Sequence, residues 1–232
     1  MKTIGLIGGM SWESSAAYYR MINQGVRNAR GPSASARCLL YSFDFSEIAA
    51  LQRAGEWAAL TQQMIHAAQT LEAAGADMVL ICTNTMHLMA DEVAAAIGIP
   101  LIHIADPAAQ AIKAADLAKV GLLGTAFTME QNFYRGYLAD KHELEVLVPE
   151  AEDRAVVHRI IYEELIAGRI EPASREAYRA IITRLAARGA QGIVLGCTEI
   201  MLLVGPDDSP VPLFDTARLH AEAAVAAALC EN

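Results

Sequence analysis

The sequence predicts an α/β protein of two similar lobes, each a parallel four-stranded sheet flanked by helices. Short apolar runs rich in β-branched residues alternate along the chain with longer helical patterns, which is the order expected of βαβ units. The chain also repeats itself, because residues 75–85 recur as residues 189–199, with the same apolar run and polar end. Two shorter segments recur in the same order, residues 2–9 as 118–125 and residues 99–102 as 211–214.

In the first half, residues 3–7 form a predicted strand, and an Ala-rich helical pattern covers residues 57–74. That helix ends at Gly75, a residue type common just after helix C-termini. Residues 78–82 are wholly apolar, as expected of a parallel strand buried on both faces. The other predicted elements are a helix capped by Ser11 and reaching about residue 28, a strand at 37–43, a helix at 90–97 and a strand at 101–104.

The second half repeats this alternation. Its predicted strands cover residues 120–123, 144–147, 193–196 and 213–214, and its predicted helices cover 129–141, 155–167, 175–188 and 217–230. No Pro- or Ser-rich linker separates the halves, so we expect them to pack tightly. The expected result is two Rossmann-like lobes: residues 1–103 plus 215–232 in the N-terminal lobe, and residues 104–214 in the C-terminal lobe.

The composition is that of an ordinary globular protein. Hydrophobic residues make up 54% of the 232 residues and charged residues 19%, which excludes a disordered chain. The net charge of −9 argues against a nucleic-acid partner, because phosphate binding needs clustered Lys and Arg. No apolar run approaches the ~20 residues of a membrane span, and the run at residues 4–10 is interpreted as a strand rather than a signal peptide. The four cysteines form neither close pairs nor a zinc spacing, which favours reduced thiols in the cytoplasm.

Polar residues follow the buried strand in each half. These segments are Thr83-Asn84-Thr85, hereafter the Thr83 tip, and its repeat counterpart Cys197-Thr198-Glu199, hereafter the Cys197 tip. In parallel α/β sheets, ligands bind beyond the carboxyl ends of the strands, so both tips are expected at one active site in a cleft between the lobes. A thiolate that faces a helix N-terminus has a lowered pKa, which makes Cys197 a candidate base. The alternative is that Cys197 is a small buried hydrophobic residue.

The two tips resemble those of the cofactor-independent aspartate/glutamate racemases. The resemblance is carried by Gly196-Cys197-Thr198-Glu199-Ile200, by Asn84-Thr85 before His87, and by the opening Ile4-Gly5-Leu6-Ile7-Gly8-Gly9, and it covers nearly the whole chain. It implies two cysteines on opposite faces of the substrate α-carbon, one acting as thiolate base and the other as thiol acid. Cys197 matches the second of these cysteines, whereas Thr83 stands at the position of the first. The chain is thus similar to members specific for L-aspartate and L-glutamate, or of broad specificity, that carry Thr at this position.

The threonine changes the chemistry that the resemblance implies. Cys197 is expected to remove the α-proton, and Thr83 to supply a proton to the other face. A threonine hydroxyl is a far weaker acid and base than a thiol, whose free pKa is ~8.5. Since the second cysteine of the family faces the L-substrate, the enzyme is expected to activate L-amino acids and to handle D-amino acids poorly. Cys82 is an open alternative to Thr83, although adjacent residues at a strand end face opposite sides, which favours a core position for Cys82.

The resemblance also implies residues that bind the substrate. Asn84, Thr85 and Thr198 can hold the α-carboxylate and stabilise the carbanion, unless they only cap strand ends. The remaining predicted contacts are Met10 through its backbone, Thr125 beside the cleft, Gln52 at the distal carboxylate with Arg53 as the alternative, and Glu199, which tunes the thiol or caps a helix. His87 is interpreted as a structural histidine.

No cofactor is predicted. Residues 5–9 lack the complete Gly-x-Gly-x-x-Gly pattern and the acidic residue of a dinucleotide site, and there is no P-loop, His-Glu-x-x-His motif or metal-ligand cluster. No lysine lies in the repeated strand-end segments, as a pyridoxal Schiff base would require. The expected partner is a small amino acid, with no nucleic acid and no membrane. A homodimer is also expected, with the helix at residues 57–74 as a candidate contact.

Two other functions remain open. A one-cysteine lyase similar to the arylmalonate decarboxylases needs a single thiol, because carbon dioxide leaves and one proton arrives. The polar Thr83 tip argues against the apolar pocket that such an enzyme needs. A non-catalytic amino-acid-binding protein would keep the carboxylate-binding threonines without any need for Cys197.

Overall fold

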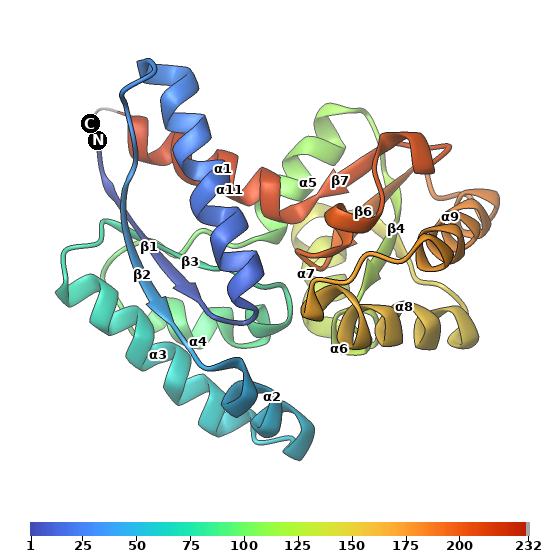
Figure 1. The fold of residues 1–232 in the computed structure, drawn as a ribbon, viewed down its shortest axis with the longest axis horizontal. Coiled ribbons are helices and arrows are strands. Elements are labelled where there is room, and N and C mark those ends of the chain that lie inside the picture. The colour runs from blue at the N-terminus through green and yellow to red at the C-terminus, as the bar shows by residue number, and fades with distance from the viewer. Residues whose placement is uncertain (231–232) are drawn as a thin grey trace. The chain divides into compact units, whose positions relative to one another are not determined.

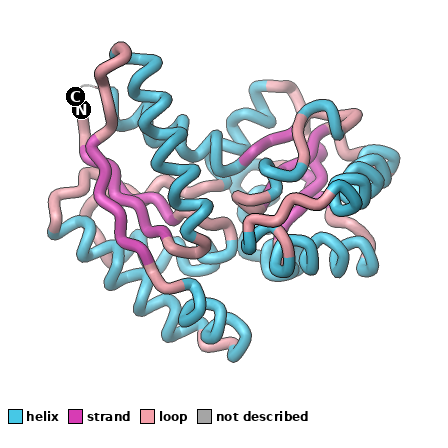
Figure 2. Tube along the Cα trace, viewed as in Figure 1, coloured by secondary structure: helices cyan, strands magenta, loops and turns pink. Residues whose placement is uncertain are grey.

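The computed structural model describes residues 1–230 and has the predicted α/β class, with two parallel sheets flanked by helices (Figure 1, Figure 2). The chain divides into two compact units. Unit 1 comprises Met1–Ile104 and the chain from His220 onward, and unit 2 comprises Ala105–Leu219. The predicted return at residue 215 comes too early, because Leu213–Asp215 still forms a strand of the second sheet. No helix within the described residues combines the length and apolarity needed to cross a membrane.

Unit 1 contains a parallel sheet in the order β2-β1-β3. Its strands are β1 (Thr3–Gly8), β2 (Arg37–Ser42) and β3 (Met78–Ile81). The prediction of four strands is wrong here, because Leu101 forms only an isolated bridge with Val79. The Val79 N–H donates to Pro100 O at 2.9 Å, and the Val79 carbonyl accepts from Ile102 N–H at 3.0 Å. The chain then enters a helix at Ala105, so no longer ladder develops.

Helices cover both faces of this sheet. They are α1 (Trp12–Arg30), α2 (Phe45–Ala54), α3 (Trp57–Ala73), the 3-10 helix η1 (Thr85–Met89) and α4 (Ala90–Ala95). A Cβ on Gly5 would lie 3.3 Å from Leu71 of α3. A Cβ on Gly8 would lie 2.5 Å from Ser15 of α1, so α1 and α3 pack on opposite faces. Ser11 caps α1 as predicted, accepting a bond from a backbone N–H of its first turn at 3.4 Å.

The helix α2 is not among the elements predicted from the sequence, although the signals for its two ends are present. Asp44 caps it, accepting from Ser46 N–H at 2.8 Å. Gly55 ends it in the left-handed conformation at φ 72°. A helix of ten residues is too short to give a strong periodic pattern. The omission matters, because α2 carries Gln52 on its buried side.

Unit 2 contains the predicted four-stranded parallel sheet, in the order β5-β4-β6-β7. Its strands are β4 (Lys119–Gly124), β5 (Glu145–Leu147), β6 (Gly192–Gly196) and β7 (Leu213–Asp215). Its helices are α5 (Ala105–Ala114), α6 (Ala126–Glu130), α7 (Asn132–His142), α8 (Ala151–Glu163), α9 (Pro172–Ala187) and α10 (Ile200–Leu203), with 3-10 turns at Leu165–Ala167 and Pro206–Asp208. The single helix predicted at residues 129–141 is wrong, because Gln131 is extended, at ψ 153°, and separates α6 from α7.

The last helix, α11 (Thr216–Leu229), begins in unit 2 and continues into unit 1. In unit 1 it packs along α1, where a Cβ on Gly25 would lie 3.1 Å from Val225 Cγ2 (Figure 1). The Lys2 N–H donates to Ala228 O at 2.9 Å, so the start of the chain lies beside α11. Unit 1 is therefore completed only when α11 is in place.

Candidate active site

In unit 1, β1 and β3 end side by side. The Cys82 N–H donates to Ile7 O at 2.9 Å, which continues the pairing of these strands to their carboxyl ends. Gly9 then turns the chain at φ 85°, where a Cβ would lie 2.2 Å from Phe43 O, so only glycine fits. Met10, which is buried, follows this turn. The structure thus places Met10 at the same edge of the sheet as the Thr83 tip.

Thr83 is the accessible residue of its tip. Every residue across positions 78–87 is buried except Thr83, which is half-buried. Cys82 is 1% exposed, and burial, with a smaller effect from the charge of Cys38, raises the pKa of the Cys82 thiol. Cys82 therefore belongs to the core of unit 1. This arrangement favours Thr83 over Cys82 as the residue that reaches a substrate.

The other residues of this tip begin η1. Asn84 and Thr85 are both buried. Gln52 approaches this segment from α2, and its Nε2 donates to Met86 Sδ at 3.4 Å. Arg53, the alternative to Gln52, is exposed. The structure therefore brings Gln52 to the segment of the Thr83 tip and leaves Arg53 at the surface.

In unit 2, β4 and β6 end side by side in the same way. Gly124 pairs with Gly196, and a Cβ on Gly124 would lie 2.9 Å from Gly196 O. Thr125 follows β4 and caps α6, its Oγ1 accepting from Thr128 N–H at 3.3 Å. Cys197 follows β6. The structure thus brings Thr125 and the Cys197 tip to one edge of the second sheet.

The Cys197 thiol lies against a carboxylate of its own tip. Cys197 Sγ donates to Glu199 Oε2 at 3.1 Å, and the Thr198 hydroxyl donates to the same oxygen at 2.7 Å. Burial, followed by the charge of Glu199, raises the pKa of the Cys197 thiol well above its ordinary value. The lowered pKa expected from the sequence is therefore wrong. Glu199 turns back onto the thiol, and the helix after this tip, α10, has only four residues.

Comparison with known proteins places the chain in a family. Residues 7–224 match the Asp/Glu/hydantoin racemase family. The chain belongs to this family. This chain is similar to a candidate Asp/Glu racemase from Yersinia pestis, whose crystal structure is known. The two share 54% identity at a TM-score of 0.93, and the match covers 99% of this chain and 100% of that one. An aspartate racemase homologue from Pyrococcus horikoshii OT3 shares 35% identity at a TM-score of 0.86, covering 98% and 99% of the two chains.

More distant racemases show how far the family likeness extends. The broad specificity amino-acid racemase RacX of Bacillus subtilis (strain 168) is 24% identical over 169 residues, which is 72% of this chain and 71% of RacX. The glutamate racemase of Francisella tularensis subsp. tularensis SCHU S4, solved with D-glutamate, shares the fold at 17% identity and a TM-score of 0.67, covering 97% of this chain and 80% of that one. The racemase fold is therefore retained at low sequence identity.

The structure adds neighbours that the racemase motifs do not indicate. Tyr178 of α9 is buried close to Cys197, and burial, followed by the charge of Cys197, raises the pKa of the Tyr178 hydroxyl. His158 of α8 accepts from Ala126 N–H at 3.1 Å, directly after Thr125, and burial lowers the pKa of its imidazole. Neither residue is near a motif in the sequence, so only the packing of α8 and α9 reveals them.

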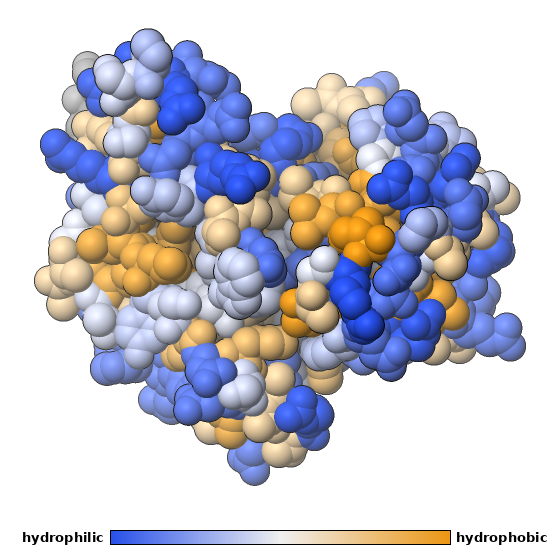
Figure 3. Space-filling view, viewed as in Figure 1, coloured by the Kyte–Doolittle hydropathy of each residue, from blue (hydrophilic) through white to orange (hydrophobic). Residues whose placement is uncertain are grey.

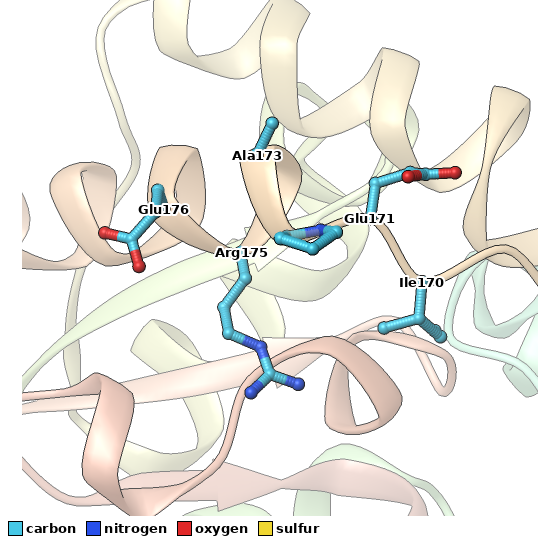
Figure 4. Close-up of a pocket in the computed structure, with 6 residues that line it drawn as sticks. Ile170, Glu171, Ala173, Arg175 and Glu176 are labelled. Atoms are coloured by element: carbon cyan, nitrogen blue, oxygen red, sulfur yellow. The ribbon is translucent and has the colours of Figure 1, made fainter.

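A surface hollow of unit 2 lies apart from these residues. It has a volume of about 460 Å³ and is lined by Ile170, Glu171, Pro172, Ala173, Arg175 and Glu176. Figure 4 shows the Arg175 side chain extending away from Glu171 and Glu176. None of the predicted site residues lines this hollow. Within residues 1–230, no three His, Cys, Asp or Glu side chains are grouped so as to hold a metal ion.

Proposed function

We propose that this chain is a cofactor-independent amino-acid racemase that acts on L-aspartate and L-glutamate. Cys197 removes the α-proton, and Thr83 supplies a proton to the opposite face. The observation that carries this proposal is the hydrogen bond between the Cys197 thiol and the Glu199 carboxylate, which places a proton acceptor 3.1 Å from the sulfur. The 54% identity to a candidate Asp/Glu racemase supports the substrate class.

A thiol of raised pKa is mostly protonated and needs help to act as a base. For Cys197, the neighbouring Glu199 gives that help. Glu199 accepts the thiol proton along the existing hydrogen bond, which leaves Cys197 as a thiolate. The thiolate removes the α-proton of the L-substrate, and the Thr83 hydroxyl donates its proton to the other face of the carbanion. Water returns a proton to Thr83, and Glu199 releases its proton to the hydroxide so formed. The sum is inversion of the substrate with the enzyme unchanged.

The carbanion has no electron sink, so hydrogen-bond donors must stabilise the charge that develops beside the α-carboxylate. Asn84 and Thr85 supply these donors in unit 1. The Thr198 hydroxyl is directed at Glu199, at 2.7 Å, so its role is to hold the base rather than the substrate. Gln52 contacts the distal carboxylate. Met10, through its backbone, and Thr125 complete the contacts.

Thermodynamics limits the preference for the L-substrate. The two enantiomers of a free amino acid have equal free energies, so the kcat/KM values for the two directions must be equal. The advantage of the L-substrate is therefore confined to the individual kcat and KM values and to exchange of the α-proton with solvent. Exchange from the L-form needs only Cys197, whereas exchange from the D-form needs Thr83 to act as a base.

Proton NMR in D₂O tests this function. L- and D-aspartate, and then L- and D-glutamate, are incubated separately with the enzyme and a metal chelator, and loss of the α-proton signal and of optical rotation is followed. We expect faster exchange from the L-forms and no exchange with Cys197→Ser. No exchange from any of the four substrates would refute the proposal for aspartate and glutamate. Release of carbon dioxide from an arylmalonate by the same enzyme would favour the one-cysteine lyase instead.

The homodimer expected from the sequence also remains a proposal. The contact is not the apolar face of α3, because that face is buried in the core of unit 1 through residues such as Leu60 and Met64. Large exposed apolar side chains lie instead on α1, at Trp12 and Tyr19, and on the edge strand β2, at Leu40. Figure 3 shows an apolar patch over β2. Light scattering coupled to size exclusion measures the mass of the particle, and a monomer would refute the dimer.

A further inference from the structure

Three histidines are buried together in unit 1, and the proposed proton transfers use none of them. His87, His103 and His220 are 3%, 8% and 0% exposed. The His87 ring meets the His103 ring edge-on with centroids 4.6 Å apart, and its centroid lies 6.0 Å from that of His220. Burying an imidazole costs free energy unless its nitrogens are hydrogen-bonded. The partners of these nitrogens therefore show which segments the histidines hold.

Both ring nitrogens of His87 are bonded to the backbone. Nδ1 donates to Thr83 O at 2.8 Å, and Nε2 accepts from Ile104 N–H at 3.1 Å. Because a carbonyl only accepts and an N–H only donates, these partners place the ring hydrogen on Nδ1 and leave Nε2 without one. The ring thus joins Thr83 to the last residue of unit 1 before the chain enters unit 2.

His220 stands where the chain returns to unit 1. Its Nε2 donates to Ile102 O at 2.7 Å, and its Nδ1 accepts from the Tyr18 hydroxyl at 2.9 Å. The hydrogen is therefore on Nε2, the opposite tautomer to that of His87. His87 and His220 thus lie bonded at the two points where the chain passes between the units.

The bond from His87 fixes a peptide plane at the Thr83 tip. Thr83 lies just beyond the last residues of β3, and its carbonyl belongs to the peptide that it shares with Asn84. On the other side of Thr83, the Ser14 hydroxyl donates to Cys82 O at 3.0 Å, which holds the peptide between Cys82 and Thr83 as well. With both peptides held, the Thr83 hydroxyl can take only the directions that its rotamers allow.

We propose that His87 is a positioning residue for the proton donor Thr83, an inference that rests on the proposed racemase function. The bond from Nδ1 keeps the Thr83 hydroxyl in reach of the carbanion, and the bond at Nε2 holds the ring in place. A displacement of about 1 Å at a reacting group costs about 10²-fold in rate. Loss of the bond to Thr83 therefore slows delivery of the proton from Thr83 and leaves the chemistry of Cys197 intact.

A ratio measured in D₂O isolates this role. After Cys197 removes the α-proton of L-aspartate, the carbanion either returns to deuterated L-aspartate through Cys197 or becomes D-aspartate through Thr83. A general loss of folded enzyme lowers both rates together and leaves their ratio unchanged. Misplacement of Thr83 raises the ratio of deuterated L-aspartate to D-aspartate.

Two substitutions separate the roles of the two ring nitrogens. In His87→Asn the amide nitrogen falls near the position of Nδ1 and still donates to Thr83 O. In His87→Gln the side chain reaches the position of Nε2 and keeps only the bond to Ile104. We expect the ratio to rise about 10-fold or more in His87→Gln and to stay within about 3-fold of the wild-type value in His87→Asn. The control Tyr18→Phe removes a bond to His220 and should leave the ratio unchanged.

An unchanged ratio in folded His87→Gln, or an equal rise in Tyr18→Phe, overturns the inference. If His87→Gln does not fold, ¹⁵N NMR of the wild-type imidazole decides. A hydrogen on Nδ1 of His87 supports the role, and a hydrogen on Nε2 overturns it, because Thr83 O would then lack its donor. A wild-type enzyme that neither exchanges nor inverts aspartate or glutamate refutes the racemase proposal itself, which is a different result from an active enzyme with an unchanged ratio.

Discussion

Substitution of Gly9 by alanine tests whether the turn after β1 has room for a side chain. A Cβ at Gly9 would lie 2.2 Å from Phe43 O and 2.3 Å from Phe43 N. Both are backbone atoms, so the overlap is relieved only by shifting one of the two segments. Gly9 also has φ 85°, in the left-handed region, where a residue with a Cβ costs about 1–2 kcal/mol.

Gly75→Ala is the matched control, because Gly75 has φ 94° and a Cβ there would meet nothing within 4 Å. We expect Gly75→Ala to lower the free energy of unfolding by about 1–2 kcal/mol, from backbone strain alone. Gly9→Ala should lose roughly 1–3 kcal/mol more, because it adds overpacking to the same strain. At about 2–4 °C per kcal/mol for a chain of this size, the Tm of Gly9→Ala should lie about 2–12 °C below that of Gly75→Ala.

Differential scanning calorimetry of the two variants, with urea unfolding as a check, measures this difference. Equal Tm values would refute the steric argument, since backbone strain alone would then account for both variants. Activity gives a second measurement. The shifted turn carries Met10 at the edge of the sheet where the Thr83 tip lies, so kcat should fall in Gly9→Ala and not in Gly75→Ala.

Three further predictions concern charge and proton transfer. Glu199→Gln removes the acceptor 3.1 Å from the Cys197 sulfur and should lower kcat about 10²–10⁴-fold, while the thiol, relieved of the carboxylate charge, ionises at lower pH in an absorbance titration referenced to Cys197→Ser. An unchanged kcat would contradict the role of this pair. Thr83→Cys should raise kcat/KM equally for both enantiomers by optical rotation, and no rise would count against Thr83 as the acid. Burial raises the pKa of Asp106, but hydrogen bonds from His142, Tyr137 and Lys141 outweigh it and lower that pKa overall. The stability that Asp106 contributes is therefore present above its unfolded pKa of about 3.9 and is lost as pH falls through the folded value. Asp106→Asn should show a smaller drop in Tm between about pH 7 and about pH 3 than the wild type, and an equal drop would refute this account.

The strand ends that carry the candidate site residues were predictable from local pattern. A wholly apolar run followed by polar residues has few interpretations in a parallel sheet other than a buried strand and its carboxyl end. The internal repeat then paired Thr83 with Cys197 without any knowledge of the fold. The direction of the Glu199 side chain was not predictable, because neighbours in space decide it. Burial of the thiol, followed by the charge of that side chain, reversed the expected direction of the pKa of Cys197.

The errors in secondary structure have similar causes. Residues 101–104 are apolar enough for a strand, but the length of a ladder depends on where the next helix begins, and α5 begins at Ala105. The helix α2 is too short for its period to stand out, although it carries Gln52. The sequence favours a structural role for His87, and its buried, doubly bonded ring agrees with that. The bond from His87 to Thr83 O is not predictable from the sequence, because it depends on the fold of η1.

Unit 2 is one continuous segment set between two parts of unit 1, so the order in which the protein is synthesised differs from the order in which its units are completed. Domains usually fold during synthesis from the N-terminus onward. Here Ala105–Leu219 has all of its residues before unit 1 does, because α1 must wait for the end of α11 to cover it near Gly25. A ribosome that stalls before His220 leaves a nascent chain with the Cys197 tip in a complete unit and the Thr83 tip in an incomplete one. Only chains translated through α11 can therefore hold both tips in complete units.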